Sequence, residues 1–431
     1  MRFLLLNPPA SRNYSRDCFI GTVVEPDVAL PPVDLAMLSG RLSELGEVAV
    51  LDAQAEGLAP AAAVARARAT APDFVFFLTS GASYVEDSAF LEALKTALPR
   101  ARLAGIGDLY LDMGEAAFQL QPFLDAALYD FAGADLAGYV SGSAGQPLEN
   151  LAYRAKGGAV VRGPVRRRYG EWSSPAPRWD LFPLACYRWP FSPEGPRASL
   201  STDYGCPFLC TYCPASALGH RTRPLEDVLA EARGLKALGA RAVFIRDQTF
   251  AAHRGRAFAL LEALAREKLG LSWTASTRVD LVDAALLSAM KKAGFSSVSF
   301  GIDTGSQELA RAYKKGTTRA QAAEAAARAR EAGLKTWGVF VIGLSMDTRE
   351  TIEETVAAAR ELGLDRVSVR VESSRYAAGY RRELLVRGFV PPESMPPDVP
   401  TTTSVWQGRL GISNDGVFDH HAKAIEEFSR N

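Results

Sequence analysis

The stretch Ala198–Cys213, ASLSTDYGCPFLCTYC, places three closely spaced cysteines just after a short apolar segment. The pattern predicts a strand over Ala198 to Thr202, followed by a loop that carries Cys206, Cys210 and Cys213. Five cysteines in 431 residues are too few for a disulfide framework, so this crowding indicates metal binding. Three thiolates suit an iron-sulfur cluster in which one iron has no protein ligand and can therefore bind a substrate.

Two other interpretations of the three cysteines stay open. They could hold a zinc ion, with His220 as the fourth ligand, because zinc commonly uses such ligands. They could also be buried thiols that bind no metal. The cluster is favoured because the cysteines follow the first strand of a longer βα series, where barrel enzymes build their active sites.

Five more strands are expected after the first one, with a helix before each. They are predicted at Arg241 to Arg246, Leu271 to Ser276, Ser297 to Gly301, Thr336 to Ile342 and Arg366 to Val371. Asp283 and Thr318 are placed to cap two of the helices, and Gly294 and Gly333 stand just past their ends. Six βα units predict a partial (β/α)6 barrel over residues 197–371.

The first part of the chain shows the same alternation of strands and helices. Strands are expected at Arg2 to Leu6, Glu47 to Leu51, Phe74 to Leu78 and Arg102 to Ile106, and helices at Val33 to Leu45, Pro60 to Ala69 and Glu86 to Leu98. This rhythm predicts an α/β domain with a parallel, doubly wound (Rossmann-like) sheet over residues 1–145.

Two further regions lack the alternation. Residues 146–196 are rich in proline, which blocks regular elements, and contain Trp172, Trp179 and Trp189, so they are expected to form an ordered linker that docks on a domain. Residues 372–431 are expected to form a small α-rich cap over the barrel mouth. Glu372 and Tyr376 in this cap are candidate substrate contacts.

Charge and hydropathy argue against nucleic acid and membranes as partners of this protein. Lys plus Arg equals Asp plus Glu, and the resulting zero net charge gives no broad field for nucleic acid or anionic membrane. No apolar run approaches the roughly 18 residues that span a bilayer. We therefore expect a cytoplasmic protein without a membrane span, acting on a small molecule.

The spacing Cys206-x-x-x-Cys210-x-x-Cys213, with aromatic Tyr212 before the last cysteine, resembles the signature of the radical SAM superfamily. The resemblance covers about residues 197–371. It implies a [4Fe-4S] cluster whose open iron binds the amino and carboxylate groups of S-adenosylmethionine, and whose electron breaks the sulfonium bond to release a 5'-deoxyadenosyl radical. It also implies an external electron donor of the flavodoxin or ferredoxin type.

The same resemblance implies contacts with S-adenosylmethionine at the strand ends. The candidates are Tyr212, Arg246, Gln248, Ser276, Arg278, Asp303 and Val341. Arg246-Asp247-Gln248 departs from the Gly-Gly-Glu that the family usually has for the methionyl amine, and Asp303 is one methylene shorter than the usual Glu. Tyr212 could instead only pack, Arg278 could form a surface ion pair, and Val341 could belong to an ordinary buried strand.

A leading doubly wound domain joined to the barrel by a Pro- and Trp-rich linker resembles the cobalamin-binding subgroup of this superfamily. Small and polar residues at the carboxyl ends of the strands are the candidate contacts: Asn7, Pro8, Thr79, Ser80, Gly105 and Gly107. No histidine precedes His220, so cobalamin is expected base-off, without a histidine lower ligand. The alternative is a sheet domain that binds nothing.

Taken together, the resemblance implies a C-methyltransferase that acts on an unactivated carbon of a small molecule or natural product through a 5'-deoxyadenosyl radical and methylcobalamin. One enzymatic alternative is a cobalamin-binding cyclase, oxidase or rearrangement enzyme without net methyl transfer. A non-catalytic zinc-binding protein is the alternative from another class.

Overall fold

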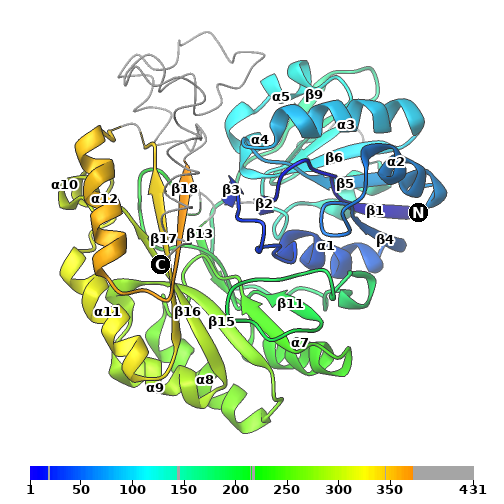
Figure 1. Ribbon diagram of the computed structural model, residues 1–431. Helices are drawn as coiled ribbons and strands as arrows, with labels where there is room; N and C mark the ends of the chain where they lie inside the picture. Colours follow the sequence, from blue (N-terminus) through cyan, green and yellow to red (C-terminus); the bar gives the residue numbers. More distant parts are fainter. Residues whose placement is uncertain (18–19, 143–145, 214, 216–218, 345, 372–431) are drawn as a thin grey trace.

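The computed structural model describes residues 1–17, 20–142, 146–213, 215, 219–344 and 346–371 as two α/β domains side by side (Figure 1). The expected cap over residues 372–431, with Glu372 and Tyr376, lies outside the described residues. Among the described residues, none of the helices combines the length and apolar character that crossing a membrane demands.

The first domain is built on one sheet whose parallel core is covered on both faces. In spatial order its strands are β4 (Glu47–Asp52), β1 (Arg2–Asn7), β5 (Phe74–Leu78), β6 (Arg102–Ile106), β7 (Ala126–Leu128), β8 (Leu151–Arg154) and β9 (Val160–Arg162). Helices α1 (Val33–Ser43) and α6 (Leu136–Ser141) pack on one face. The other face carries α2 (Pro60–Ala69), α3 (Tyr84–Ala97), α4 (Asp108–Met113) and α5 (Ala116–Leu120).

This sheet extends beyond residue 145, where the sequence placed its end. Strands β8 and β9 pair antiparallel after β7, inside the range expected to be a linker. Both strands are short and antiparallel, so they lack the βα rhythm that marks the rest of the domain. The remaining linker is ordered, since Trp179 and Trp189 are 2% and 3% exposed and donate hydrogen bonds to Glu231 and Thr274 of the barrel.

The second domain is a six-stranded, fully parallel sheet with helices on its outside. Its strands, in both spatial and sequence order, are β11 (Arg197–Leu200), β14 (Ala242–Ile245), β15 (Ser272–Arg278), β16 (Phe295–Asp303), β17 (Lys335–Ile342) and β18 (Arg366–Val371). The helices are α7 (Leu225–Ala237), α8 (Arg254–Glu267), α9 (Ala284–Lys292), α10 (Gln307–Ala312), α11 (Arg319–Glu331) and α12 (Arg349–Glu361). Because β11 and β18 do not pair with each other, the barrel is open.

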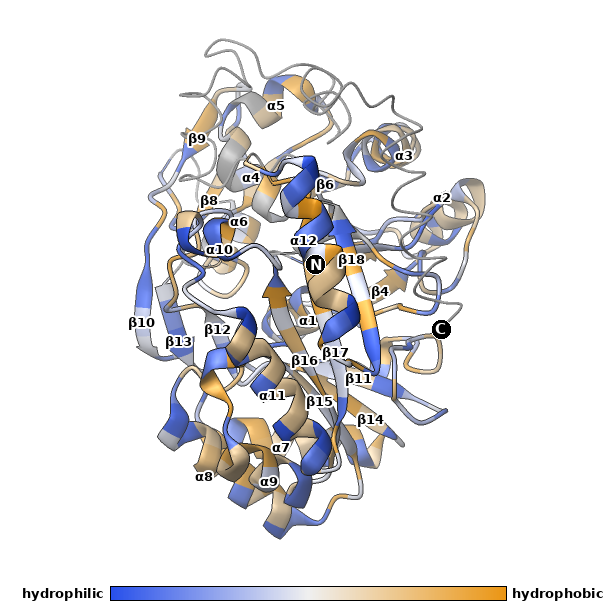
Figure 2. Ribbon diagram, turned by 60° about the vertical axis from the view of Figure 1, so that its left-hand side comes forward, coloured by the Kyte–Doolittle hydropathy of each residue, from blue (hydrophilic) through white to orange (hydrophobic). Residues whose placement is uncertain are grey.

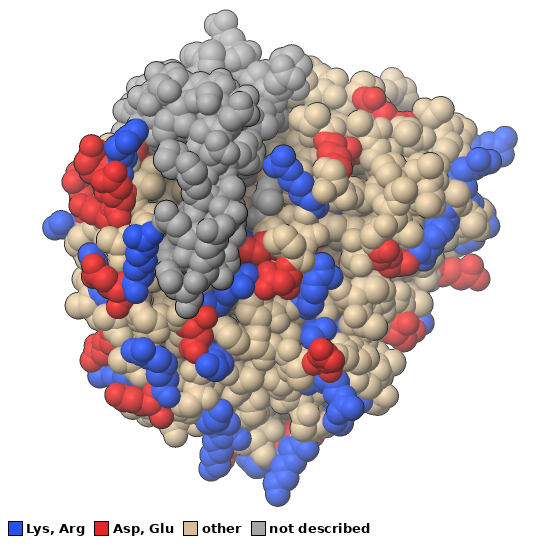
Figure 3. Space-filling view, in the orientation of Figure 1, with Lys and Arg blue, Asp and Glu red and all other residues tan. Residues whose placement is uncertain are grey.

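Local sequence signals explain the barrel helices. The side chains of Asp283 and Thr318 accept hydrogen bonds from Leu286 and Gln321, and therefore cap α9 and α11 as expected. Helices α7, α9 and α11 show hydrophobic residues beside hydrophilic ones, as amphipathic helices on a sheet do (Figure 2). Acidic and basic residues are interspersed over the barrel side of the face in Figure 3, in keeping with the balanced net charge.

The cysteine loop follows a separate short strand rather than β11 itself. Strand β12 (Asp203–Gly205) pairs with β13 (Gly219–Thr222), which also pairs with β10 (Arg168–Glu171) from the expected linker. This small sheet frames the loop from both sides. The loop nevertheless lies at the carboxyl ends of the barrel strands, as the sequence predicted.

A segment of the first domain reaches across to the barrel. We call residues 14–17 and 20–30 the bridging segment; it contains the hairpin strands β2 (Tyr14–Asp17) and β3 (Ile20–Val23) and lies between the two sheets (Figure 1). Its residues Val24 and Val28 are buried with Trp189, Phe244 and Trp337 in one hydrophobic cluster. The bridging segment thus fills part of the open side of the barrel.

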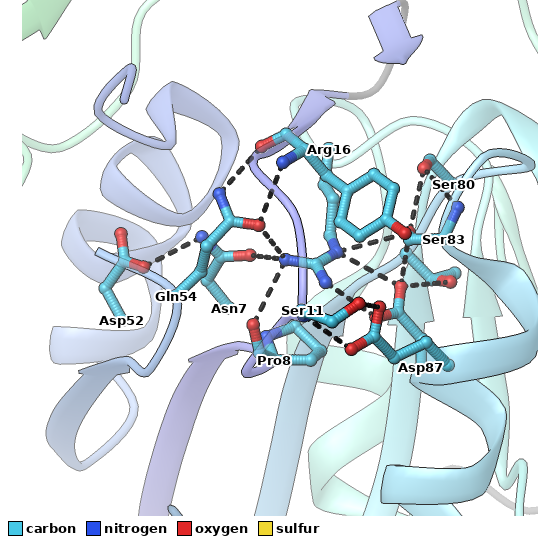
Figure 4. A network of polar contacts seen from close by, with 12 residues as sticks. Asn7, Pro8, Ser11, Arg16, Asp52, Gln54, Ser80, Ser83 and Asp87 are labelled. Atoms are coloured by element: carbon cyan, nitrogen blue, oxygen red, sulfur yellow. Dashed lines mark hydrogen bonds and ion pairs between the residues drawn. The ribbon is translucent and has the colours of Figure 1, made fainter. Parts of the chain in front are cut away.

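Arg16 fixes the bridging segment to the carboxyl edge of the first sheet (Figure 4). Its side chain is 1% exposed and forms an ion pair of 2.8 Å with buried Asp87. Further hydrogen bonds run from this guanidinium to Ser83, to the side chain of Asn7, to the Pro8 carbonyl and to Gln54. A buried cation is tolerated only when paired and hydrogen-bonded in this way.

We expect Arg16→Met to lower the free energy of unfolding by about 3–5 kcal/mol, because it leaves the Asp87 carboxylate buried without its cation. Urea denaturation followed by circular dichroism measures the effect. Arg178→Met is the control, since it breaks an exposed pair with Asp180 and should cost about 1 kcal/mol or less. The Arg16→Met/Asp87→Asn double variant should be more stable than Arg16→Met alone, and equal losses in Arg16→Met and Arg178→Met would contradict the assignment.

Candidate functional site

One cavity at the carboxyl ends of the barrel strands collects the predicted chemistry. The three cysteines and all seven predicted contacts for S-adenosylmethionine line it, namely Cys206, Cys210, Cys213, Tyr212, Arg246, Gln248, Ser276, Arg278, Asp303 and Val341. They come from the cysteine loop and from β15, β16, β17 and the end of β14. The structure therefore brings together residues that are up to 135 positions apart in the sequence.

The cysteine loop is tied to the ends of two strands. The Arg278 Nη1 atom lies 3.7 Å from the Cys210 sulfur, and the Cys206 sulfur lies 3.4 Å from the Thr249 hydroxyl. Burial raises the pKa of the Cys210 thiol, while the nearby Lys315 cation acts in the opposite direction. A thiol that coordinates a metal is deprotonated regardless, because the metal charge outweighs the cost of burial.

A zinc ion and a [4Fe-4S] cluster place different demands on the positions of three cysteine sulfurs. Zinc holds each sulfur at about 2.3 Å, so its thiolate ligands must converge on one point. Within the part of the chain that the structure describes, no three His, Cys, Asp or Glu side chains gather around one such point. A [4Fe-4S] cluster binds each cysteine through a different iron and therefore accepts sulfurs that lie further apart.

His220, the fourth ligand of the zinc interpretation, lies elsewhere. Its Nε2 atom is 3.4 Å from the Asp203 carboxylate, and its ring lies 5.0 Å from that of His253. Together with Gly170 and Thr222, these histidines line a separate depression on the small sheet. The cavity that holds the three cysteines is therefore not lined by His220.

Asp303 is the carboxylate of the cavity. The Tyr212 hydroxyl donates to it, and the Lys315 Nζ atom lies 2.5 Å from its Oδ2. Asp303 has a left-handed φ of +68° at the end of β16, where the register with β17 shifts. Burial and the Asp303 charge raise the pKa of Tyr212 well above its ordinary value, so this phenol stays a hydrogen-bond donor.

Arg278 forms an ion pair, as the alternative to a contact with S-adenosylmethionine expected, but this ion pair is not at the surface. The Arg278 side chain is 7% exposed, and its guanidinium makes two hydrogen bonds to Asp280, at 2.9 and 2.8 Å. It also donates to the Lys315 carbonyl and stacks over the Phe208 ring at 4.1 Å. These contacts orient the guanidinium beside the cysteine loop.

The three side chains that follow β14 contact different parts of the molecule. The Gln248 Oε1 atom accepts a hydrogen bond of 2.8 Å from the Gly205 amide, which fixes the start of the cysteine loop. Asp247 accepts hydrogen bonds from Thr202 and is buried, and burial together with the neighbouring Asp203 charge raises its pKa. Arg246 forms an ion pair with Asp17 of the bridging segment.

Several residues of the cavity were missed by sequence reasoning. They are Lys315 and Arg370 of the barrel and Ser15, Thr22, Val24 and Leu30 of the bridging segment. Lys315 and Arg370 belong to no motif in the sequence. The bridging residues come from a domain that sequence patterns treat as a separate unit, so no local signal could place them here.

The six predicted cobalamin contacts do not face this cavity. Asn7, Thr79 and Ser80 are buried at the sheet edge, where Asn7 bonds Arg16 and Asp52 and Thr79 bonds Asp87. Gly21 of the bridging segment presses so closely on Ser80 that a Cβ atom there would lie 2.5 Å from the serine Cβ.

The remaining three predicted cobalamin contacts are also occupied. The Pro8 carbonyl accepts from Arg16, Gly105 makes room for the Tyr110 ring, and Gly107 lies against the Thr79 carbonyl. The bridging segment thus covers the edge at which a corrin ring was expected. The six residues therefore already have partners within the chain, and their assignment as cobalamin contacts stays a prediction.

Comparisons with known proteins relate the chain to one family. The model of the radical SAM superfamily matches residues 200–359. An uncharacterised methyltransferase of Pyrococcus horikoshii is 28% identical over 374 residues, which are 85% of this chain and 79% of the relative. The anaerobic magnesium-protoporphyrin IX monomethyl ester cyclase of Rubrivivax gelatinosus is 30% identical over 224 residues, 51% of this chain and 40% of the cyclase.

Two solved structures share the fold of both domains. The radical S-adenosylmethionine methyltransferase TsrM of Kitasatospora setae, with cobalamin and a [4Fe-4S] cluster bound, has a TM-score of 0.67 at 19% identity and covers 90% of this chain and 75% of its own. The cobalamin-dependent radical enzyme OxsB has a TM-score of 0.62 at 16% identity, covering 90% and 55%. Residues 200–359 therefore form a domain that matches the radical SAM superfamily, and the two domains together have the fold of TsrM and OxsB.

Proposed function

We propose that this chain holds a [4Fe-4S] cluster on Cys206, Cys210 and Cys213 and uses it to cleave S-adenosylmethionine into a 5'-deoxyadenosyl radical. The observation that carries the proposal is that the three thiols and the seven predicted strand-end contacts line one cavity. An electron from a flavodoxin- or ferredoxin-type donor would reduce the cluster. The bound cluster supplies the electron that breaks the sulfonium bond.

The chain itself would position the nucleoside. Arg278, held by Asp280 and by the Phe208 ring, suits the methionyl carboxylate, since guanidinium and carboxylate form strong charge-assisted hydrogen bonds. Asp303 suits the ribose hydroxyls, because a carboxylate accepts two hydrogen bonds. Gln248 follows β14, where the methionyl amine is expected, and its Oε1 atom, which already accepts from the Gly205 amide, has a second lone pair for that amine.

The overall reaction that we propose is methyl transfer to an unactivated carbon of a small molecule, with base-off cobalamin as the methyl carrier. Support comes from the relative described as a methyltransferase and from the fold shared with TsrM and OxsB. Cobalamin supplies a transferable methyl group when bound. We assign it no contacts, because the bridging segment covers the predicted ones.

Anaerobic reconstitution with iron and sulfide should give a brown protein with about four irons and four sulfides per chain. Cys206→Ala should lose this absorbance, because the cube loses one of its three protein ligands. Cys186→Ala is the matched control, since Cys186 is a free cysteine that does not line the cavity. Stoichiometric zinc in protein purified without oxygen would refute the cluster.

Asp303→Asn should weaken the binding of S-adenosylmethionine about tenfold, equal to about 1.4 kcal/mol, because the ribose loses a charged acceptor. Asparagine tolerates the left-handed backbone of this position, so the iron content should not change. Asp365→Asn is the control, because Asp365 pairs with Lys335 at the opposite end of β17. Calorimetry on the reconstituted proteins would disprove the assignment if both variants bound S-adenosylmethionine equally well.

Product analysis tests the reaction class. Reduced, reconstituted protein supplied with cobalamin, methyl-labelled S-adenosylmethionine and the small-molecule fraction of a cell extract should form S-adenosylhomocysteine and 5'-deoxyadenosine in roughly equal amounts. The label should appear in one small molecule. If 5'-deoxyadenosine formed without S-adenosylhomocysteine, the enzyme would be a cyclase, oxidase or rearrangement enzyme instead.

A further inference from the structure

The cavity continues beyond the cysteine loop into an apolar recess. Phe244 of β14 and Trp337 of β17 form its floor, with ring centroids 6.3 Å apart and exposed fractions of 2% and 3%. Val339 of the barrel and Val24 and Leu30 of the bridging segment line the same cavity. None of these five side chains was expected to contact S-adenosylmethionine, so this apolar part of the cavity lining has no role in the nucleoside site.

Two guanidinium groups stand at this recess. The charged side chains that line the whole cavity are four cations, Arg246, Arg278, Lys315 and Arg370, and one carboxylate, Asp303. Arg278 and Lys315 are engaged beside the cysteines, with Asp280 and Asp303. Arg370 was not among the predicted contacts of S-adenosylmethionine, and Arg246, which was, has no role in the nucleoside positioning proposed above.

Arg246 and Arg370 lie close enough to repel each other. Burial and the Arg370 charge lower the pKa of Arg246 to about 10, so Arg246 still carries its proton at neutral pH. The side chains of Arg246 and Arg370 are 8% and 12% exposed. Two buried like charges are costly unless anions compensate them.

The bridging segment provides the compensation in this structure. Arg246 pairs with Asp17, and the Arg370 Nη1 atom lies 2.7 Å from the Glu25 Oε2 atom. Burial alone would raise the pKa of Glu25, but the Arg370 charge and the hydrogen bonds that Glu25 accepts together outweigh burial, and the pKa is lowered. The Arg246 guanidinium, paired with Asp17, also lines the cavity.

We propose that the substrate is an organic acid whose carboxylate is bound by Arg246 and Arg370 and whose apolar or aromatic body lies on Trp337. The inference rests on the proposed function, because it takes the recess beside the nucleoside to be the substrate site. Guanidinium groups bind carboxylates in a bidentate geometry. A binding site that is also lined by aromatic rings gains further affinity from dispersion contacts with an apolar ligand body. The Arg246 guanidinium already lies 5.3 Å from the Phe244 ring centroid.

The test compares an acid with its uncharged analogue. Reconstituted protein with S-adenosylmethionine and no reductant is titrated by calorimetry with 3-phenylpropionate and with 3-phenylpropionamide. The wild type should bind the acid at least tenfold more tightly, about 1.4 kcal/mol. Arg370→Met should lose this preference, and Arg246→Met should reduce it, because each removes one guanidinium from the recess.

Arg366→Met is the matched control. Arg366 lies on the same strand, four residues before Arg370, and also pairs with the bridging segment, at Asp27, but it does not line the cavity. This variant should keep the preference for the acid. Equal loss in Arg366→Met and Arg370→Met would mean that tethering of the bridging segment, rather than anion binding, is affected, and would overturn the proposal.

Two further results would overturn it. One is equal binding of the acid and the amide by the wild type. The other is a preference that survives in Arg370→Met while the affinity for hydroxocobalamin falls, because the guanidinium would then serve the cobalamin phosphodiester. Release of 5'-deoxyadenosine after reduction, measured on the same samples, separates the two proposals. Radical formation without a preference for the acid would refute only the proposed substrate class. A preference for the acid without radical formation would refute only the proposed function.

Discussion

A guanidinium removed from water must find acceptors for its donors, and the place of Arg16 between the two domains follows from this constraint. Its partners are two side chains from the ends of β1 and β4, a carbonyl, and the Ser83 and Asp87 side chains at the start of α3. Such a set exists only if the hairpin lies against the edge of the first sheet. The position of the hairpin then decides which residues form the wall of the barrel cavity.

Much of the fold could be predicted because the signals are local. The strands Phe74–Leu78 and Arg102–Ile106 are bounded as predicted, and Asp283 caps α9 through its own side chain. The cysteine spacing led directly to the barrel family, and periodicity placed the strand ends that line the cavity. These features depend on residues within a few positions of one another, so a single sequence carries enough information to find them.

What the sequence could not provide depends on contacts between distant residues. The segment around Arg16 has no clear period, and its partners at Asp87 and Arg246 are 71 and about 230 positions away. Asn7, Thr79 and Ser80 are small and polar, as residues that approach a flat cofactor would be. The same properties also let a second piece of backbone approach, as Gly21 does over Ser80. Residue type alone does not distinguish these two uses.

The burial of Val24 and Val28 against Phe244 and Trp337 has a consequence for the independence of the domains. The side chains that close the open barrel are encoded near the start of the chain, between β1 and α1, and not within the barrel sequence. A fragment cut at the linker and expressed alone would present an uncovered aromatic surface to water. The two halves of this protein are therefore one folding unit, even though each has its own sheet.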